Sequence, residues 1–328
     1  MRATVIIPCY RPDTNFEKML DDLNAQTSQE FTVVFADDGN VVPIEPRINA
    51  RLKRPFHVIR FQENQGIVAG LNACVKHAST PFIIRMDADD RMPPNRIANQ
   101  LSFMESHPDV DVAGASMAVF GSGLRVWSKP LEHDGILAGL LWSPSLNHPT
   151  VIAKTSILKK HAYPSGFSLA EDYALWLEMA THGVRFANML DVAVYYRMEG
   201  QNTSQTGDDK RARRYTSLFK HAISSLLGEA SLTALEDGIV QGCHHVLADI
   251  PLPSGIERPN GQALAAYASA LDRELSKTAA TWAKLAQTEV NNRLYRATTN
   301  ARWHKLFPVF QLSRLPMSAW SLLLSSNR

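Results

Sequence analysis

The chain has 328 residues, of which 45% are hydrophobic and 20% are charged, and its formal net charge is +2. This composition is ordinary for a soluble globular protein, and the near-balanced charge argues against a protein that binds nucleic acid over its whole surface. The length suits one large domain with an appendage, or two domains of moderate size.

The cysteine content and the N-terminus indicate the cellular compartment in which the protein works. Cys9, Cys74 and Cys243 lack the spacing of a metal site, and so few cysteines suit a reducing environment. The N-terminus runs directly into the apolar residues 5–7, without the leader of a signal peptide. No run of about 18 apolar residues predicts a membrane-spanning helix. We therefore expect a cytoplasmic protein.

Two hydrophobic periods alternate over residues 1–120. Short apolar runs predict buried strands at 3–7, 31–36, 56–61, 81–86 and 110–120. Between them, helical spacing predicts three helices with the inward faces Phe16/Met19/Leu20/Leu23, Ile67/Leu71/Cys74/Ala78 and Ile97/Leu101/Met104. This alternation is typical of an α/β domain with a mostly parallel sheet flanked by helices.

The pattern weakens over residues 121–165 and then changes character. A helix face is marked by Leu169, Tyr173, Trp176 and Ala180, and residues 191–197 read as a strand. Strand signals vanish after residue 205, where Ala-, Leu- and Glu-rich helical patterns dominate, as in 263–296. We therefore predict an α/β domain over 1–205 and an α-helical C-terminal extension over 206–328.

Three polar clusters directly follow expected strands. They are Pro-Cys-Tyr at 8–10, Asp-Asp-Gly at 37–39 and Asp-Ala-Asp-Asp at 87–90. Ligands of open α/β sheets bind beyond the carboxyl ends of the strands, so we expect the clusters to converge on one site.

The acidic cluster 87–90 is the most informative of the three. Its carboxylates repel one another unless a cation lies among them, and hard oxygen ligands suit Mg²⁺ or Mn²⁺. The structural alternative is an acidic loop that caps the following helix.

The other polar residues are ambiguous when each is taken alone. Asp37 and Asp38 could accept hydrogen bonds from a base or a ribose, or form an ordinary Asp-Gly turn. Tyr10 could stack on a base or lie on a rim. The Glu171-Asp172 pair at a helix start could cap the helix or act as a general base. No phosphate-binding loop, dinucleotide fingerprint or nucleophile elbow occurs.

In this order, the clusters resemble the family 2 glycosyltransferases, whose GT-A fold is a Rossmann-like mixed sheet flanked by helices. The matching pieces are VIIPCY at 5–10, ADDG at 36–39, ENQG at 63–66 with GLN at 70–72, RMDADD at 85–90 with PNRI at 94–97, and AEDYALW at 170–176, with Tyr196 and Arg197 closing the region. The resemblance covers roughly residues 1–205 and leaves the C-terminal extension outside it.

The resemblance implies a role for each matched residue. The nucleotide-sugar donor would be bound by Pro8, Tyr10, Asp37, Asp38, Asn64, Gly66, Asn72, Arg85, Asp87 and Ala88. Pro8 and Tyr10 would line the base pocket, and Asp38, with Asp37 as the alternative, would bind the base. The resemblance gives Asp89, with Asp87, the divalent ion, and it gives Asp172 the role of general base beside Glu171. It also implies inversion at the anomeric carbon.

One departure concerns the segment after Tyr196 and Arg197. Many relatives carry a His there, near the diphosphate, and this chain has Glu199, whose carboxylate would repel a diphosphate. Phosphate contacts would then come from Arg197 or from the basic run 210–214, which otherwise reads as a solvated helix face. His148 matches a position that the family often fills with His, on the acceptor side.

The C-terminal stretch 297–328 has no acidic residue and mixes basic with aromatic side chains. It could bind an anionic membrane surface or pack onto the protein or onto a second copy. A glycan or glycolipid acceptor fits the family, and a UDP-sugar is the expected donor, ahead of a dTDP-sugar. The alternatives are a sugar nucleotidyltransferase, which would need a Gly-rich, Lys-bearing loop, and a non-catalytic domain that binds a nucleotide sugar.

Overall fold

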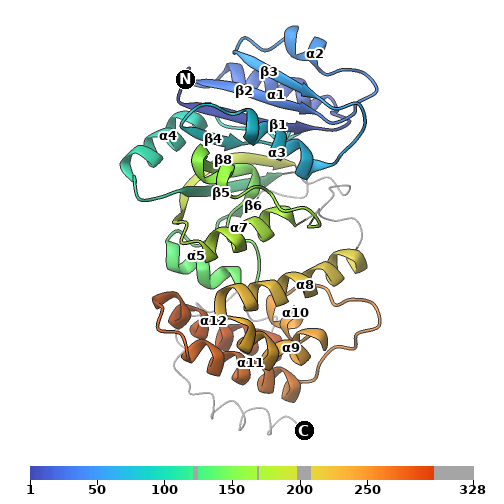
Figure 1. Ribbon diagram of the computed structural model, residues 1–328, viewed down its shortest axis with the longest axis vertical. Coiled ribbons are helices and arrows are strands. Elements are labelled where there is room, and N and C mark those ends of the chain that lie inside the picture. Colours follow the sequence, from blue (N-terminus) through green and yellow to red (C-terminus); the bar gives the residue numbers. More distant parts are fainter. Residues whose placement is uncertain (121–124, 168–169, 198–207, 299–328) are drawn as a thin grey trace. The chain divides into compact units, whose positions relative to one another are not determined.

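The computed structural model describes residues 1–120, 125–167, 170–197 and 208–298. The chain divides into two compact units (Figure 1). Unit 1 contains Met1–Ile136 and Pro144–Ser204, and unit 2 contains Leu137–Ser143 and Gln205–Arg328. The short segment 137–143 therefore leaves the sequence of unit 1 to become part of unit 2.

Unit 1 is built on a mixed sheet of eight strands in the order β3-β2-β1-β4-β7-β5-β6, with β8 also paired to β5. The strands are β1 (Ala3–Cys9), β2 (Phe31–Asp37), β3 (Phe56–Arg60), β4 (Phe82–Arg85), β5 (Val112–Phe120), β6 (Arg125–Trp127), β7 (Ile152–Lys154) and β8 (Phe186–Arg197). Strands β1 to β4 are parallel to one another, and so are β5 and β8. β7 joins the two groups through antiparallel pairings.

Helices cover both faces of this sheet, and its central strands β1 and β2 are therefore buried. Alternate residues of β1 and β2 share one core with α1 (Asn15–Asn24) and α4 (Arg96–Ser106). On the opposite face, α3 (Ile67–His77) packs against β1 and β2. The residues that the 3.6-residue period predicts to face inward are buried in α1 and α4. In α3, Leu71 and Cys74 are buried as predicted, but Ile67 is only partly buried and Ala78 lies just beyond the helix.

Several elements of unit 1 were not expected from the sequence. They are α2 (Glu45–Asn49), α5 (His133–Leu140), the 3-10 turn η1 (His148–Thr150), α6 (Thr155–Lys160), and the strands β6 and β7. Most of them lie in the weakly patterned stretch 121–165, and the strands β6 and β7 have three residues each. Such short strands form through pairing with distant strands, which no local period records. Helix α7 (Glu171–Thr181) was expected, and β8 begins at Phe186, ahead of the expected residue 191.

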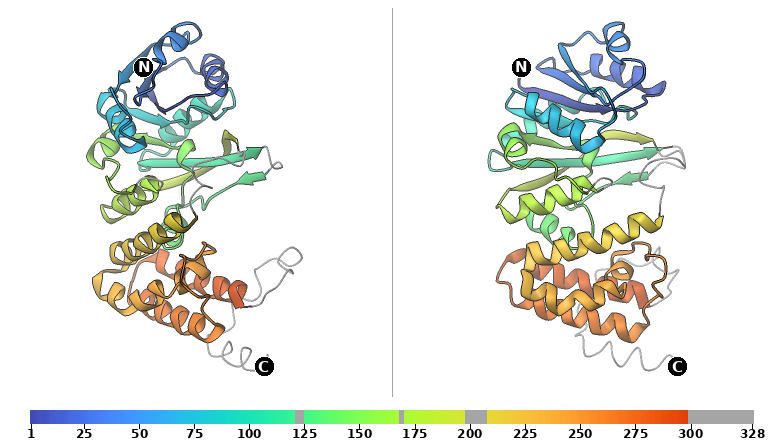
Figure 2. Two further views of the ribbon diagram at one scale, coloured as in Figure 1. Left: turned by 90° about the vertical axis from the view of Figure 1, so that its right-hand side faces the viewer. Right: turned by 45° about the vertical axis from the view of Figure 1, so that its right-hand side comes forward.

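Unit 2 is helical, as expected (Figure 2). It contains α8 (Asp208–Leu227), α9 (Glu229–Val240), α10 (Cys243–Ala248), α11 (Gly261–Ser276) and α12 (Thr281–Thr298). The expected helical stretch 263–296 is thus two helices. Segment 137–143 lies in the core of this unit, where Trp142 stacks on His244 and lies under Arg293, and His244 Nε2 lies 2.7 Å from the Leu141 carbonyl oxygen.

No helix among the described residues is long and apolar enough to cross a membrane. The C-terminal stretch for which membrane contact was predicted lies almost wholly in residues 299–328, outside the described part of the chain.

Candidate functional site

The strand register brings the predicted polar clusters to one edge of the sheet. Cys9 at the end of β1 pairs with Asp37 at the end of β2, and Ile6 of β1 pairs with Arg85 at the end of β4. Because the three strands are parallel, the loops that follow them leave the sheet side by side. The expected convergence of 8–10, 37–39 and 87–90 is therefore found.

Asp37 and Asp38 are both buried, and each carboxylate holds a different piece of the chain. Asp37 accepts from the side chain of Asn40 (2.7 Å) and from the guanidinium of Arg60 (2.9 Å). Asp38 accepts from the backbone amides of Gln65 (2.7 Å) and Gly66 (3.0 Å) and from the side chain of Asn64 (2.8 Å). Asp38 thus joins the loop after β2 to the start of α3.

Two glycines make this junction possible. Gly39 has a φ of +66°, and a Cβ at this position would lie 2.3 Å from the backbone nitrogen of Asn64. Gly66 begins α3 with a φ of +87°. Both positions use left-handed backbone that side chains rarely adopt. The Asp-Gly signal at 38–39 is therefore a turn and also the place where two loops touch.

A surface pocket opens beside this junction. It is lined by Tyr10, Arg11, Pro12, Gly39, Asn40, Val41, Val42 and Arg47. Tyr10 is 47% exposed, and the Arg11 guanidinium lies over its ring. The aromatic face and the apolar rim suit a planar ring such as a nucleobase. Pro8 does not line this pocket, and it lies instead at the end of β1 against α3, where its Cβ is 3.4 Å from the position a Gly70 Cβ would take.

The acidic loop 87–90 follows β4, and its carboxylates differ in environment. Asp87 is half-buried and pairs with the buried guanidinium of Arg85 at 2.5 Å. Asp89 is exposed, whereas Asp90 is buried. Ala88 packs against the core. An exposed carboxylate next to one held in place by an arginine is a donor set that fits a hard divalent cation.

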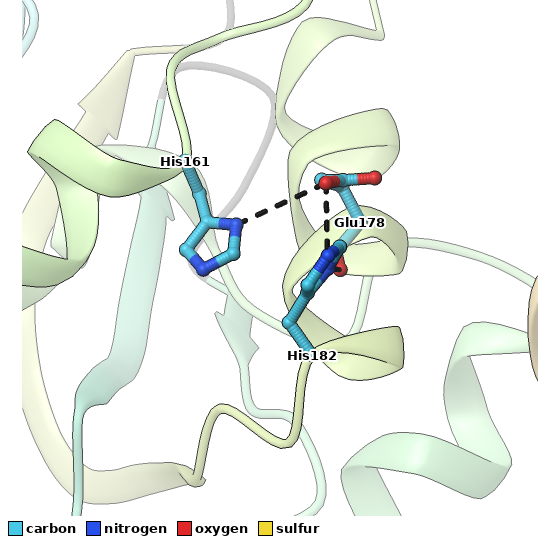
Figure 3. A group of neighbouring side chains, drawn as sticks. All are labelled: His161, Glu178 and His182. Atoms are coloured by element: carbon cyan, nitrogen blue, oxygen red, sulfur yellow. Dashed lines mark hydrogen bonds and ion pairs between the residues drawn. The ribbon is translucent and has the colours of Figure 1, made fainter.

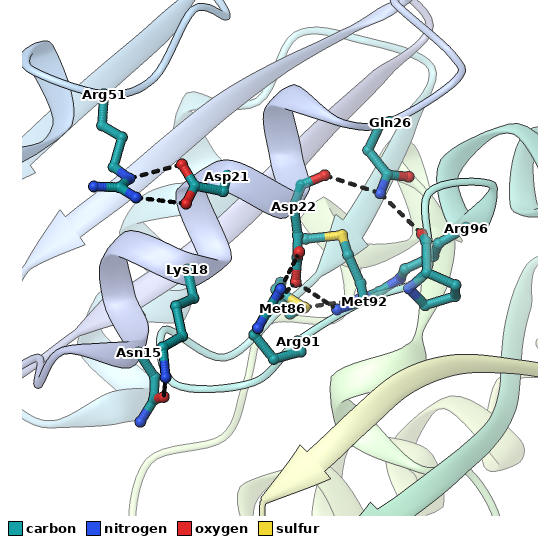
Figure 4. Close-up of polar contacts among 11 residues, drawn as sticks. Asn15, Lys18, Asp21, Asp22, Gln26, Arg51, Met86, Arg91, Met92 and Arg96 are labelled. Atoms are coloured by element: carbon teal, nitrogen blue, oxygen red, sulfur yellow. Dashed lines mark hydrogen bonds and ion pairs between the residues drawn. The ribbon is translucent and has the colours of Figure 1, made fainter.

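Asp22 of α1 and Gln26, two residues past the end of this helix, hold the chain just after the acidic loop (Figure 4). The Asp22 carboxylate accepts two hydrogen bonds from Arg91 (2.5 and 2.7 Å) and one from the amide of Met92 (3.0 Å). The Gln26 side chain donates to the Pro93 carbonyl at 2.9 Å. These positions were not singled out from the sequence. The available signal was a carboxylate on the buried face of α1, followed four residues later by an amide just past the end of the helix.

A second support comes from Arg96, which is fully buried. Its guanidinium donates to the carbonyl oxygens of Arg85 (2.7 Å) and Pro149 (2.8 Å), and burial lowers the pKa of Arg96 to about 9. Arg96 therefore ties the end of β4 to the 3-10 turn that carries His148.

The Glu171-Asp172 pair lies at the start of α7. Asp172 accepts from the backbone amide of Tyr173 at 2.8 Å. Burial raises the pKa of Asp172, and the positive charges of Arg85 and Lys129 oppose that rise. The charge of Arg85 therefore favours the ionised form of Asp172, while its guanidinium pairs with Asp87. Lys129, which also donates to the Pro144 carbonyl at 2.7 Å, was not identified from the sequence.

His148 is buried and meets Tyr163, another residue that the sequence did not single out. The His148 Nε2 atom lies 2.8 Å from the Tyr163 hydroxyl. Burial holds the pKa of His148 well below its usual value and raises that of Tyr163, so both side chains are neutral near pH 7. Asn72 exchanges two hydrogen bonds of 2.9 Å with the backbone of Tyr163, so its polar atoms position this loop.

The predicted phosphate-binding region falls mostly outside the described residues. Arg197 ends β8, where its backbone pairs with Phe120, and nothing is described of its side chain. Glu199 lies in the undescribed stretch 198–207. In the basic run, Arg213 pairs with Asp209 and donates to the Ser254 carbonyl.

Comparison with known proteins shows the family to which the chain belongs. The sequence model of Glycosyl transferase family 2 matches residues 4–169, half of the chain. The chain belongs to this family. It is accordingly a glycosyltransferase, and the nucleotidyltransferase and non-catalytic alternatives are set aside. A curated family relative is the amylovoran biosynthesis glycosyltransferase AmsE of Erwinia amylovora, 29% identical over 59% of this chain and 75% of its own length.

Solved structures share the fold of this family 2 glycosyltransferase. Staphylococcus aureus TarS 1–349 in complex with UDP-GlcNAc aligns with a TM-score of 0.58 and 17% identity, over 91% of this chain and 84% of that one. The mannosyltransferase PcManGT of Pyrobaculum calidifontis, in complex with GDP-Man and Mn²⁺, aligns with a TM-score of 0.54 and 18% identity, over 93% and 88%. At these identities the likeness concerns the GT-A fold alone.

Proposed function

We propose that this chain is an inverting glycosyltransferase that moves a sugar from a nucleotide diphosphate to an acceptor hydroxyl. The observation that carries the proposal is Arg85. It pairs with Asp87 of the acidic loop and favours the ionised form of Asp172, which supports one shared site for the donor-side and acceptor-side carboxylates. The catalytic unit is residues 1–205, with 206–328 as the helical extension.

The donor would occupy the edge of the sheet beyond β1, β2 and β4. The base would lie against Tyr10 in the surface pocket, with Asp37 and Asp38 shaping the loop beside it. Because both carboxylates already hold protein donors, they would act by fixing this loop as well as by binding the base. UDP is our first choice of nucleotide, supported by the UDP-GlcNAc complex of TarS, and dTDP is the second.

The acidic loop suits Mg²⁺ or Mn²⁺, held by Asp89 together with Asp87. The Mn²⁺ in the complex of PcManGT supports this choice. Such an ion, when bound, neutralises the negative charge that develops on the leaving diphosphate. Arg85 would keep one oxygen of Asp87 in place, and Asp22 and Gln26 would hold the segment that follows the loop.

Asp172 would accept the proton of the acceptor hydroxyl. The acceptor oxygen then forms a bond to the anomeric carbon, and the bond from that carbon to the diphosphate oxygen breaks with its electron pair. Attack from the face opposite the leaving group inverts the anomeric centre. A raised pKa makes Asp172 a stronger base than an ordinary aspartate, which favours this role near neutral pH. Glu171 and the neutral pair of His148 and Tyr163 would position the acceptor.

The acceptor is proposed to be a glycan or a glycolipid of a bacterial surface polysaccharide pathway, as the relative AmsE suggests. The enzyme would then work in the cytoplasm. Peripheral contact with a membrane through 297–328, or contact with a second copy, stays a prediction from the sequence.

The proposal is tested by measuring release of nucleotide diphosphate from a panel of sugar nucleotides, with Mn²⁺, with Mg²⁺ and with a chelator. We expect metal-dependent release from one donor, and the Asp89→Ala variant should lose both this release and metal-dependent donor binding. The Asp172→Asn variant should keep donor binding and lose transfer by about a hundredfold or more. Absence of release and of calorimetric binding across the whole panel would overturn the proposal.

A further inference from the structure

Three potential metal ligands meet at the ends of α6 and α7, within unit 1 (Figure 3). His161 directly follows α6, His182 directly follows α7, and Glu178 lies one turn before His182. One nitrogen from each imidazole and one oxygen of the carboxylate lie within 4.8 Å of one another. None of these residues belongs to the proposed transferase site.

We propose that His161, Glu178 and His182 form a separate binding site for a divalent transition-metal ion, for which zinc is the probe. Two imidazoles and one carboxylate are a ligand set that zinc uses in proteins, with water as the fourth ligand. The same set is poor for Mg²⁺, which prefers oxygen ligands. The site is therefore distinct in chemistry from the acidic loop.

The distances are close to those that a bound ion needs. The Glu178 Oε1 atom lies 3.4 Å from His182 Nδ1 and 3.9 Å from His161 Nδ1. Ligand atoms held at about 2.1 Å by one tetrahedral ion lie about 3.4 Å apart. All three ligand atoms lie within 4.8 Å of one another, so the two imidazoles would move closer together when an ion binds. The side chains of Glu178 and His182 are 46% and 47% exposed, so they can make this adjustment and an ion can enter.

His161 is the observation that sets this group apart from an ordinary surface cluster. It is only 5% exposed, and its buried Nε2 atom makes no hydrogen bond to a described residue. The ring nitrogen that faces Glu178 is Nδ1, and an ion at this position would use that atom of the buried ring.

The partners of His182 are those of a ligand that the protein holds in place. Its Nδ1 atom lies 2.9 Å from the carbonyl oxygen of Glu178 and 3.1 Å from the Thr181 hydroxyl. These contacts hold Nδ1 beside the Glu178 carboxylate, and an ion that bound Nδ1 would replace the hydrogen bond to the carbonyl oxygen. The half-exposed ring can turn to present either nitrogen.

A bound ion would join the end of α6 to the last turn of α7. The chain between these points carries Tyr163, and α7 begins with Glu171 and Asp172. The ion would therefore close a loop around the acceptor side of the proposed site and restrain it, without touching substrate.

Zinc binding to the full chain tests the proposal, by competition with a chromophoric chelator. The Asp89→Asn variant is the reference, because it removes zinc that would bind at the acidic loop. We expect this reference to hold one zinc ion per chain, and the added changes His182→Ala and Glu178→Gln each to weaken binding by at least about tenfold. Mg²⁺ in excess should not displace the zinc.

His107→Ala is the matched control. His107 ends α4, and its Nδ1 atom likewise lies 2.9 Å from the carbonyl oxygen four residues earlier, but it has no place in the cluster. Zinc affinity should not change in this variant. The proposal is overturned if the Asp89→Asn chain retains no zinc, or if His182→Ala binds it as tightly as His107→Ala does. Glu178 and His182 are half-exposed, so His182→Ala and Glu178→Gln should leave the hydrophobic core intact. Misfolding would therefore not produce the expected loss of zinc affinity.

Discussion

Asp172 is the residue on which the proposed chemistry depends most. Burial raises its pKa, and the amide of Tyr173 and the charges of Arg85 and Lys129 act in the opposite direction. Only the ionised carboxylate can accept a proton. The balance of these influences therefore sets the lowest pH at which the enzyme can work.

Lys129→Met should move the acid limb of the pH profile for kcat/KM to higher pH. The substitution removes a positive charge that favours the ionised form of Asp172, so the pKa of Asp172 rises and a higher pH is needed to deprotonate it. The check is kcat/KM measured across the acid range. Lys154→Met is the control, because Lys154 pairs with Asp111 instead. An acid limb at the same pH in all three proteins would contradict the assignment of Asp172 as base.

The sequence predicted the carboxylates of the site but not the residues that position them. Asp38, Asp89 and Asp172 stand directly after strands or at a helix start, where topology alone places ligands. Lys129 and Tyr163 act on residues far away in the sequence, through contacts that exist only once β4, β7 and α7 are assembled. Hydrophobic periods and motifs describe residues that are close along the chain. They therefore did not predict contacts between residues that are distant in the sequence.

Helix α1 links the hydrophobic core to the acidic loop. Its apolar face is buried in the core of unit 1. Asp22 on the helix and Gln26 just past its end contact the segment 91–93. The neighbouring Asp21 faces outward and pairs with Arg51 at the surface. Figure 4 shows both pairs on the same helix.

Asp22→Ala should weaken metal-dependent donor binding by about tenfold, because the loss of hydrogen bonds to Arg91 and Met92 releases the end of the acidic loop. The measurement is donor affinity as a function of Mn²⁺ concentration. Asp21→Ala removes an equally bidentate aspartate–arginine pair one residue earlier and should leave this affinity unchanged. Equal losses in both variants would show that α1 acts through stability alone.

Helices α9 and α11 of unit 2 meet at a glycine. A Cβ at Gly238 would lie 2.1 Å from the Tyr267 ring, and Tyr267 is buried with its hydroxyl 2.6 Å from His244 Nδ1. Alanine normally stabilises a helix interior by up to about 1 kcal/mol over glycine.

Gly238→Ala should nevertheless destabilise the protein, by about 1–3 kcal/mol, because the methyl group forces the Tyr267 ring out of its site. Chemical denaturation gives this free energy. Ala234→Gly, at an exposed position of α9, measures the helix-propensity effect by itself. A Gly238→Ala protein that is more stable than the wild type would contradict the close packing described.

The elements that were foreseen are those with a strong local period. The strands β1 and β2 and the helices α1, α3 and α7 each have a continuous apolar face, and so have the helices of unit 2. The stretch 121–165 contains β6, β7 and α6, which are short and take their stability from antiparallel pairing and burial. Their sequences carry too few residues for a period to show.

At the scale of the whole molecule, the two units do not correspond to two continuous stretches of sequence. Residues 137–143 belong to unit 2 although they lie between two parts of unit 1. A boundary near residue 205 describes the rest of the chain but not this segment. Leu141 and Trp142 are fully buried, and their described partners within unit 2 include His244 and Arg293.

Trp142→Ala should therefore destabilise the helices of unit 2, although Trp142 is encoded within the α/β part of the sequence. Loss of a fully buried tryptophan costs about 3–5 kcal/mol. Hydrogen exchange should become faster in α10 and α12, which carry His244 and Arg293, and stay unchanged in β1 and β2. Trp127→Ala, at a 38% exposed position, should change hydrogen exchange neither in these helices nor in these strands. Faster exchange in the central strands of unit 1 instead would show that residues 137–143 stabilise the sheet, and the division into these two units would be wrong.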